Sequence, residues 1–287
     1  MGQADSGYNF KPHGFAMIEA GPGFFIDVTL VTLAALTVGM LLEVLLPVRD
    51  GVISIVRWFN NAGLALVTYV CSHLFGTFVA AFVLYSAEPG DVLNLTKWPL
   101  WLDLSIVFLA LELTRYGTHV AMHKVPVLWR FHAVHHADST VDISTSFRHH
   151  PIEAIISTGP LTAVILLLGS APEALILYRA LDLIMSVMTH TNVNVSVRLE
   201  RWLRYMVVTP AFHRSHHFAE KRFTDSNYGA SVPWFDYLFS TYQPATLEQQ
   251  KYASIGLNTH TVNEQRIDGM LFAPFAEPLK AAPHARS

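Results

Sequence analysis

Five apolar segments constrain most strongly what this chain can fold into. A helix of about 20 apolar residues is long enough to cross the hydrocarbon core of a bilayer. Three segments reach that length, and two shorter ones predict a helical hairpin that either crosses the membrane or only enters it: 23–47, 62–85 and 100–123, then 152–169 and 172–190. The sequence therefore predicts an all-α integral membrane bundle of three long spans plus a short helical hairpin.

The composition agrees with a membrane protein and excludes several other classes. Hydrophobic residues make up 52% of the chain and charged residues 14%, whereas soluble domains carry about 25% charged residues. The net charge of −3 gives no indication of a nucleic-acid partner. Cys71 is the single cysteine, so the chain has neither an internal disulfide framework nor a cysteine-ligated cluster.

The distribution of basic residues predicts the orientation of the bundle through the positive-inside rule. The loops 86–99 and 169–172 contain only Lys97, and the other connections carry Arg49, Arg57, Lys124, Arg130, Arg198, Arg201 and Arg204. We therefore expect an outside N-terminus and cytoplasmic loops. The predicted organisation is an N-terminal tail, a transmembrane helical region, and a cytoplasmic cap with the C-terminal tail: 1–22, 23–190 and 191–287.

Histidines gather at the predicted cytoplasmic ends of these helices. One HxxxH pattern, two HxxHH patterns and a single histidine between the latter two supply nine imidazoles. They are His119 and His123; His132, His135 and His136; His190; and His213, His216 and His217. Residues three and four apart share one face of a helix. Nine imidazoles exceed the four ligands of one tetrahedral zinc and suit two metal ions. A solvated histidine-rich surface is disfavoured because the same spacing recurs.

The order of the three patterns, "HVAMH", "HAVHH" and "HRSHH", resembles the fatty acid hydroxylase/sterol desaturase superfamily of integral-membrane non-haem di-iron oxygenases. The flanking stretches "SFRHHPIE", "HTNVN" and "TDSNYG" are similar to those of bacterial sterol desaturase-like members. The likeness covers about residues 100–242, which we expect to form one functional domain.

The resemblance implies a cofactor, partners and a location. It implies two iron ions that activate O₂ and oxidise a C–H bond of a lipid, with the histidines of the three patterns and His190 as ligands. Zinc suits the same imidazoles and is expected to replace iron in some purified samples. No haem domain is fused to the chain, so electrons are expected from a separate electron-transfer protein. The expected location is the bacterial inner membrane, with the metal site facing the cytoplasm.

Four further residues are candidates around the metal site. The family's His-Pro element corresponds to His150, here preceded by an additional His149, and we expect His150 to be a tenth ligand or a group near the metal. A metal-bound histidine normally donates its other N–H to a carboxylate or a carbonyl. Asp138, Asp182 and Asp225 lie near the ligand histidines in sequence and are the expected acceptors. No catalytic residue is predicted beyond the metal ligands.

These observations predict a hydroxylase of a fatty acyl, sterol or related lipid. A lipid or sterol desaturase is an alternative, because removal of a second hydrogen at the same centre gives a double bond. A histidine-rich membrane metal transporter is the alternative of another class. Transporters place their ligands near the bilayer midplane, whereas these histidines gather at one edge, so the transporter is disfavoured.

Overall fold

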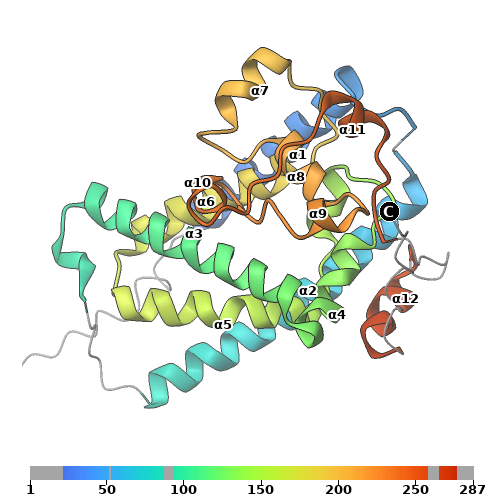
Figure 1. Cartoon of the computed structure of the whole chain (residues 1–287). Coiled ribbons are helices and arrows are strands. Elements are labelled where there is room, and N and C mark those ends of the chain that lie inside the picture. Colours follow the sequence, from blue (N-terminus) through green and yellow to red (C-terminus); the bar gives the residue numbers. More distant parts are fainter. Residues whose placement is uncertain (1–21, 52, 87–92, 258–264, 277–287) are drawn as a thin grey trace, which may run out of the picture.

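The structure is a computed structural model that describes residues 22–51, 53–86, 93–257 and 265–276 (Figure 1). These residues are helical or irregular. Their only extended pairings are two isolated bridges, Pro47–Val193 and Phe218–Ile255. The predicted all-α class is confirmed for this part of the chain. The predicted N-terminal tail, apart from Pro22, lies outside the described residues.

All five apolar segments form long helices. These are α1 (Pro22–Leu45), α2 (Ile55–Ser86), α3 (Leu100–Lys124), α5 (Pro151–Leu168) and α6 (Pro172–Thr189). The turn of the predicted hairpin has a local cause. Gly169 ends α5 in the left-handed region at φ 55°, which glycine adopts without strain. Pro172 then opens the first turn of α6, where its missing N–H is not needed.

Short helices connect and cover the long ones. They are η2 (Leu95–Lys97), α4 (Pro126–His136), η3 (Ile143–Phe147), α7 (Val197–Leu203), α8 (Pro210–His216), α9 (Lys221–Thr224), α10 (Trp234–Leu238), α11 (Leu247–Tyr252), α12 (Ile267–Phe272) and η5 (Ala273–Phe275). Figure 1 shows most of them gathered at one side of the long helices, where α8 and α9 lie close to α4.

The helix α3 occupies the centre of the packing. It contacts α4, α5 and α6, while α2 packs against α5 and α1 against α6. Val107 and Leu111 of α3 form an apolar core with Leu168 of α5 and Tyr178 of α6. The acidic groups of α3, Asp103 and Glu112, are also buried. The Glu112 carboxylate, for example, accepts hydrogen bonds from the Tyr178 hydroxyl at 3.0 Å and the Ser231 backbone N–H at 2.9 Å.

Two helices of the described part are long and apolar enough to cross a membrane. They are residues Ile55–Val79 within α2 and the whole of α5; the segment Leu30–Leu45 of α1 is apolar but shorter. The expected third span, α3, contains Asp103, Glu112 and Arg115 and does not qualify. The helices predicted from the sequence are therefore present, whereas a bundle of three long spans is not confirmed.

Candidate metal centre

The nine histidines of the three patterns and His190 lie together in two adjacent groups. In each group the candidate ligand nitrogens lie within 4.8 Å of one another. All the side chains are buried except that of His119, which is half-buried. The first group is His119, His123, His132, His136 and His216, and the second is His135, His190, His213 and His217. Residues almost one hundred positions apart in sequence therefore form one centre.

Each HxxHH pattern is divided between the two groups. On α4, His132 and His136 belong to the first group and His135 to the second. At α8 the assignment is reversed, because His216 joins the first group while His213 and His217 join the second. Positions i and i+4 share a helical face and position i+3 lies beside it. Two such helices facing each other therefore supply both groups at once.

Helix ends are directed at the centre. His123 lies in the last turn of α3, His136 in the last turn of α4, and His190 is the residue that caps α6. The C-terminal end of a helix carries a partial negative charge, which favours a nearby cation. Neutral imidazoles leave bound metal ions uncompensated, so these helix ends supply part of the missing negative charge.

The outer nitrogens of the rings fix their orientation. The Nδ1 atoms of His119, His216 and His190 lie 2.8, 2.6 and 2.8 Å from the backbone oxygens of Tyr228, Ser226 and Ser186. A carbonyl oxygen only accepts hydrogen bonds, so each of these Nδ1 atoms carries the proton and donates it. In a neutral ring the lone pair is then on Nε2, the nitrogen that faces the centre.

The facing Nε2 atoms indicate a metal. His119 Nε2 lies 3.1 Å from His132 Nε2 and 3.0 Å from His216 Nε2, and His190 Nε2 lies 2.9 Å from His213 Nε2. Because Nδ1 of His119, His132 and His216 each faces an oxygen acceptor, the first two contacts bring two lone pairs together with no proton between them. Ligand nitrogens at about 2.1 Å from one ion are separated by about 3 Å when they are neighbours. The residues present therefore fit two bound metal ions.

Buried nitrogens without partners support the same conclusion. Both ring nitrogens of His123 and the Nε2 atom of His136 are buried and have no hydrogen-bond partner among the described residues. A buried polar atom without a partner costs about 1–3 kcal/mol. Coordination of a metal ion at these nitrogens removes that cost.

The environment keeps the imidazoles neutral. Burial lowers the pKa of His136, His213 and His217 well below the ordinary value of about 6.5, and repulsion between neighbouring imidazoles adds to the effect. Burial also lowers the pKa of His216 to about 3. Only the neutral ring offers a lone pair to a metal ion, so the centre is ready to bind at neutral pH.

The two histidines of the His-His-Pro element take different places. The His149 ring stacks on the His135 ring at a centroid distance of 4.4 Å. His150 belongs to neither group: its Nδ1 accepts the Ile152 backbone N–H at 3.1 Å and its Nε2 lies 3.2 Å from the Leu271 oxygen. The structure thus places His149, rather than the predicted tenth ligand His150, against the centre.

Glu153 connects the two groups, and the sequence analysis did not identify it. Its Oε1 atom accepts from His132 Nδ1 at 2.8 Å and from His149 Nδ1 at 2.9 Å, and its side chain is buried. One carboxylate therefore orients a ring of the first group and the ring stacked on His135 of the second. Glu153 lies at the start of the predicted helix 152–169, four residues after His149, and this closeness in sequence was the signal available.

A Glu153→Ala variant is expected to bind metal about 10- to 100-fold more weakly, because loss of a carboxylate that orients a ligand histidine has that effect. Titration of the metal-loaded protein with a chelator measures the change. Glu173, an exposed residue of α6, provides the control variant Glu173→Ala. Equal metal retention by the two variants would show that Glu153 does not position the ligands.

The three predicted aspartates are not equivalent. Asp225 lies nearest, but its Oδ1 atom is 3.8 Å from His123 Nδ1, too far for a hydrogen bond. Asp138 pairs with the buried Arg57 at 2.7 Å and accepts from Thr145. Asp182 pairs with Arg115 and Arg179. In the described residues none of the three is hydrogen-bonded to a histidine of the centre, and the acceptors are Glu153 and backbone oxygens.

Comparison with known proteins gives a family match over the region that contains the centre, and several relatives. The sequence model of the fatty acid hydroxylase family matches residues 104–241. An ornithine lipid hydroxylase from Rhizobium tropici is 26% identical over 146 residues, which is 51% of this chain and 43% of that protein. An alkylglycerol monooxygenase from Xenopus tropicalis is 27% identical over 171 residues, 58% of this chain and 34% of that protein.

A third relative has a different reaction in its name. A very-long-chain aldehyde decarbonylase from Oryza sativa subsp. indica is 27% identical over 165 residues, which is 52% of this chain and 26% of that protein. The chain thus covers less than half the length of each of these relatives. No solved structure matches the chain.

Proposed function

The chain belongs to the fatty acid hydroxylase superfamily, and on that premise we propose that it hydroxylates a C–H bond of a lipid with two iron ions and O₂. The observation that carries the proposal is the pair of buried histidine groups, one of five and one of four imidazoles. The names of two relatives are those of a hydroxylase and a monooxygenase, so hydroxylation is favoured over desaturation.

A bound iron pair supplies the redox chemistry that activates O₂, and the protein controls access and orientation. The Nδ1 contacts to Tyr228, Ser226 and Ser186 hold three rings with their lone pairs toward the centre. Burial of the rings excludes bulk water, which limits side reactions at an oxidising centre. Glu153 accepts two N–H groups and thereby couples the positions of His132 and His149.

The surroundings of the centre support a membrane lipid as the substrate. The side chains of Leu66, Leu74 and Phe78 on α2 are 65–68% exposed, as expected for a helix surface that contacts lipid tails. We place α2 and α5 across a membrane, with α1, α3 and α6 beside them. The centre lies at the C-terminal ends of α3 and α6. A membrane lipid therefore reaches it from the bilayer, without transfer through water.

The orientation remains part of the proposal. Arg49, Lys124 and Arg130 lie in loops that are predicted to be on the same side of the membrane as the histidine groups. The positive-inside rule then supports a centre at the cytoplasmic face. Arg57 is a weaker indicator of orientation, because it is buried and paired with Asp138 and Asp142. Electrons come from a separate electron-transfer protein that docks at the cytoplasmic face.

The proposed reaction is tested by comparing the lipids of cells that express the wild-type chain or the His135→Ala variant under ¹⁸O₂. Hydroxylation is expected to give a lipid heavier by one labelled oxygen atom, found only with the wild type. A product lighter by two hydrogen atoms and without label identifies a desaturase instead. Identical lipids in both cultures, with both chains present in the membrane, would contradict the proposal.

A further inference from the structure

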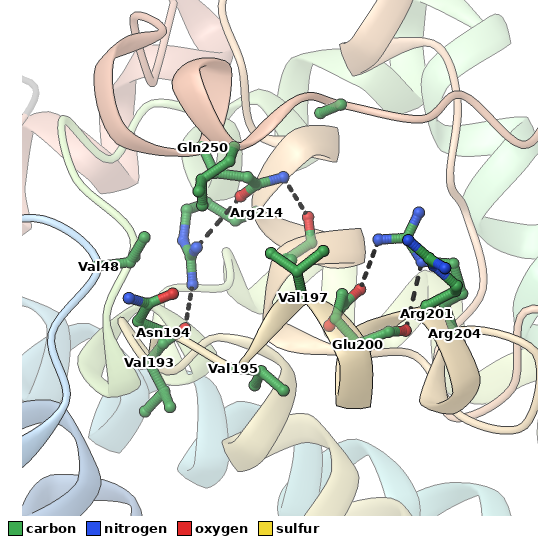
Figure 2. Close-up of a pocket in the computed structure, with 13 residues that line it drawn as sticks. Val48, Val193, Asn194, Val195, Val197, Glu200, Arg201, Arg204, Arg214 and Gln250 are labelled. Carbon is green, nitrogen blue, oxygen red and sulfur yellow. Dashed lines mark hydrogen bonds and ion pairs between the residues drawn. The ribbon is translucent and has the colours of Figure 1, made fainter.

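A pocket separate from the metal centre lies between α7, α8 and α11. It has a volume of about 290 Å³. Its walls come from the segment after α1, the segment after His190, and these three helices. Figure 2 shows the side chains that line it, among them Arg201, Arg204, Arg214, Glu200 and Gln250. On a helix, Arg214 is rotated by about 100° from its neighbour His213, so the pocket is on another side of α8.

Arg214 is a buried cation that forms no ion pair with a carboxylate of the described residues. Its residue is 1% exposed. Its guanidinium donates to the Gln250 side chain at 3.1 Å and to the Thr191 oxygen at 3.1 Å, while its Nε has no hydrogen-bond partner among the described residues. A buried charge is strongly unfavourable unless it is paired. The Nη2 atom of Arg214 also donates to the Val193 oxygen at 3.2 Å, so the acceptors of this charge among the described residues are neutral. Arg214 thus adds a positive charge to the lining of the pocket.

The remaining charged groups define what the pocket accepts. Arg201 is exposed and forms no ion pair with the described residues. Arg204 pairs with Glu200 at 3.2 Å, but the second oxygen of Glu200, Oε2, is buried without a partner. Three arginines therefore face one carboxylate in the lining. A ligand that satisfies these groups carries an oxyanion for the arginines and an N–H donor for Glu200.

Exposed apolar side chains form part of the lining. Val197 of α7 and Leu247 of α11 line the pocket and are 58% and 47% exposed. Val48 also lines the pocket, and its backbone N–H donates a 3.1 Å hydrogen bond to the Asn192 oxygen. Apolar surface beside a charged pocket suits an amphiphile.

We infer that this pocket binds the headgroup of a zwitterionic lipid, an oxyanion joined to an ammonium, with the acyl chains lying on the apolar side chains of α7 and α11. The oxyanion contacts Arg201 and Arg214, and the ammonium contacts Glu200. The site is independent of the proposed hydroxylation, because it requires neither metal nor turnover. The pocket also lies against α8, which carries His213, and against the segment that follows His190. Arg214 of α8 joins the two by donating to the Thr191 oxygen.

Binding is tested with the detergent-purified full chain and short-chain phosphatidylethanolamine, followed by thermophoresis. Arg201→Ala is expected to weaken binding about tenfold, the loss typical of one charged hydrogen bond. Arg198, an exposed arginine of the same helix that does not line the pocket, gives the matched control Arg198→Ala, with unchanged affinity. Arg214→Lys keeps the charge but not the fork of donors, and is expected to weaken binding as well.

Three further ligands identify what is recognised. Phosphoethanolamine has the headgroup without chains, phosphatidylglycerol has the anion without the ammonium, and diacylglycerol has neither charge. Weaker binding of all three supports the inference, as does loss of the preference for phosphatidylethanolamine over phosphatidylglycerol in Glu200→Gln. Equal losses in Arg201→Ala and Arg198→Ala, or phosphoethanolamine binding as tightly as the lipid, overturns it.

Discussion

A His136→Ala variant is expected to retain about one metal ion per chain instead of two and to lose hydroxylase activity by about a hundredfold or more. His136 belongs to the five-membered group, and its buried Nε2 atom has no other partner. Even the loss of a residue that only orients a ligand costs 10- to 100-fold, so removal of a ligand has at least that effect. Elemental analysis of the purified protein measures the metal content, and product formation measures the activity.

The second group gives the companion variant and the control. His190→Ala removes one of only four nitrogens and is expected to have the same consequence for the other ion. His150→Ala is the matched control, because His150 lies beside the centre in sequence but outside both groups. Loss of metal from His150→Ala, or full metal content in both other variants, would show that the two groups are not the binding sites.

Acidification is expected to destabilise the metal-free protein steeply. Burial lowers the pKa of His216 to about 3 and those of His213 and His217 well below their ordinary value. In the unfolded chain these groups titrate near 6.5, so below that pH the unfolded state binds protons that the folded state does not. Stability is therefore complete above about pH 6.5 and falls as the pH decreases toward the folded-state values.

The magnitude of this effect follows from proton linkage. Each such histidine contributes a slope of about 1.4 kcal/mol per pH unit in that window. Melting temperatures of chelator-treated protein at pH 7.5, 6.5 and 5.5 measure the change, and the metal-loaded protein is the comparison. We expect most of the decrease in the melting temperature of the metal-free protein to occur between pH 6.5 and pH 5.5. A melting temperature that does not change with pH would mean that the rings already share protons when folded.

The grouping of the nine histidines was predictable because their spacing carries the information. His132 and His136, or His213 and His217, share a helical face in any helix of the right length. The number of histidines predicts two ions, and the structure divides the same nine residues into two groups; the number of bound ions stays a prediction. The division of each HxxHH pattern between the groups depends on how α4 and α8 face each other, and helix-helix orientation is not encoded in the spacing.

The groups that orient the ligands were much less predictable. Most are backbone oxygens, such as those of Tyr228 and Ser226, and every residue has a backbone oxygen. The aspartates near the boxes were plausible acceptors by proximity in sequence, but Asp138 instead compensates the buried charge of Arg57. Glu153 reaches its role only because the start of α5 packs against α4.

The same tertiary effects explain the differences in the fold. The helix α3 was expected to be a span because it is long and apolar. Its acidic residues can lie in an apolar helix only because each accepts a hydrogen bond from another part of the chain. Glu112 accepts from the Ser231 backbone N–H, and Asp103 accepts from the Ala171 backbone N–H. Such partners come from distant parts of the chain, so hydropathy alone identified the helix without establishing whether it crosses a membrane.

The interleaving of the two HxxHH patterns sets a rule for engineering this scaffold. An enzyme that works with a single ion cannot be obtained by erasing one pattern, because erasing either one strips nitrogens from both groups. A designer must instead substitute by face, changing His135 on one helix together with His213 and His217 on the other. Grafting a single pattern onto a foreign helix would likewise transplant two half-sites rather than one whole one.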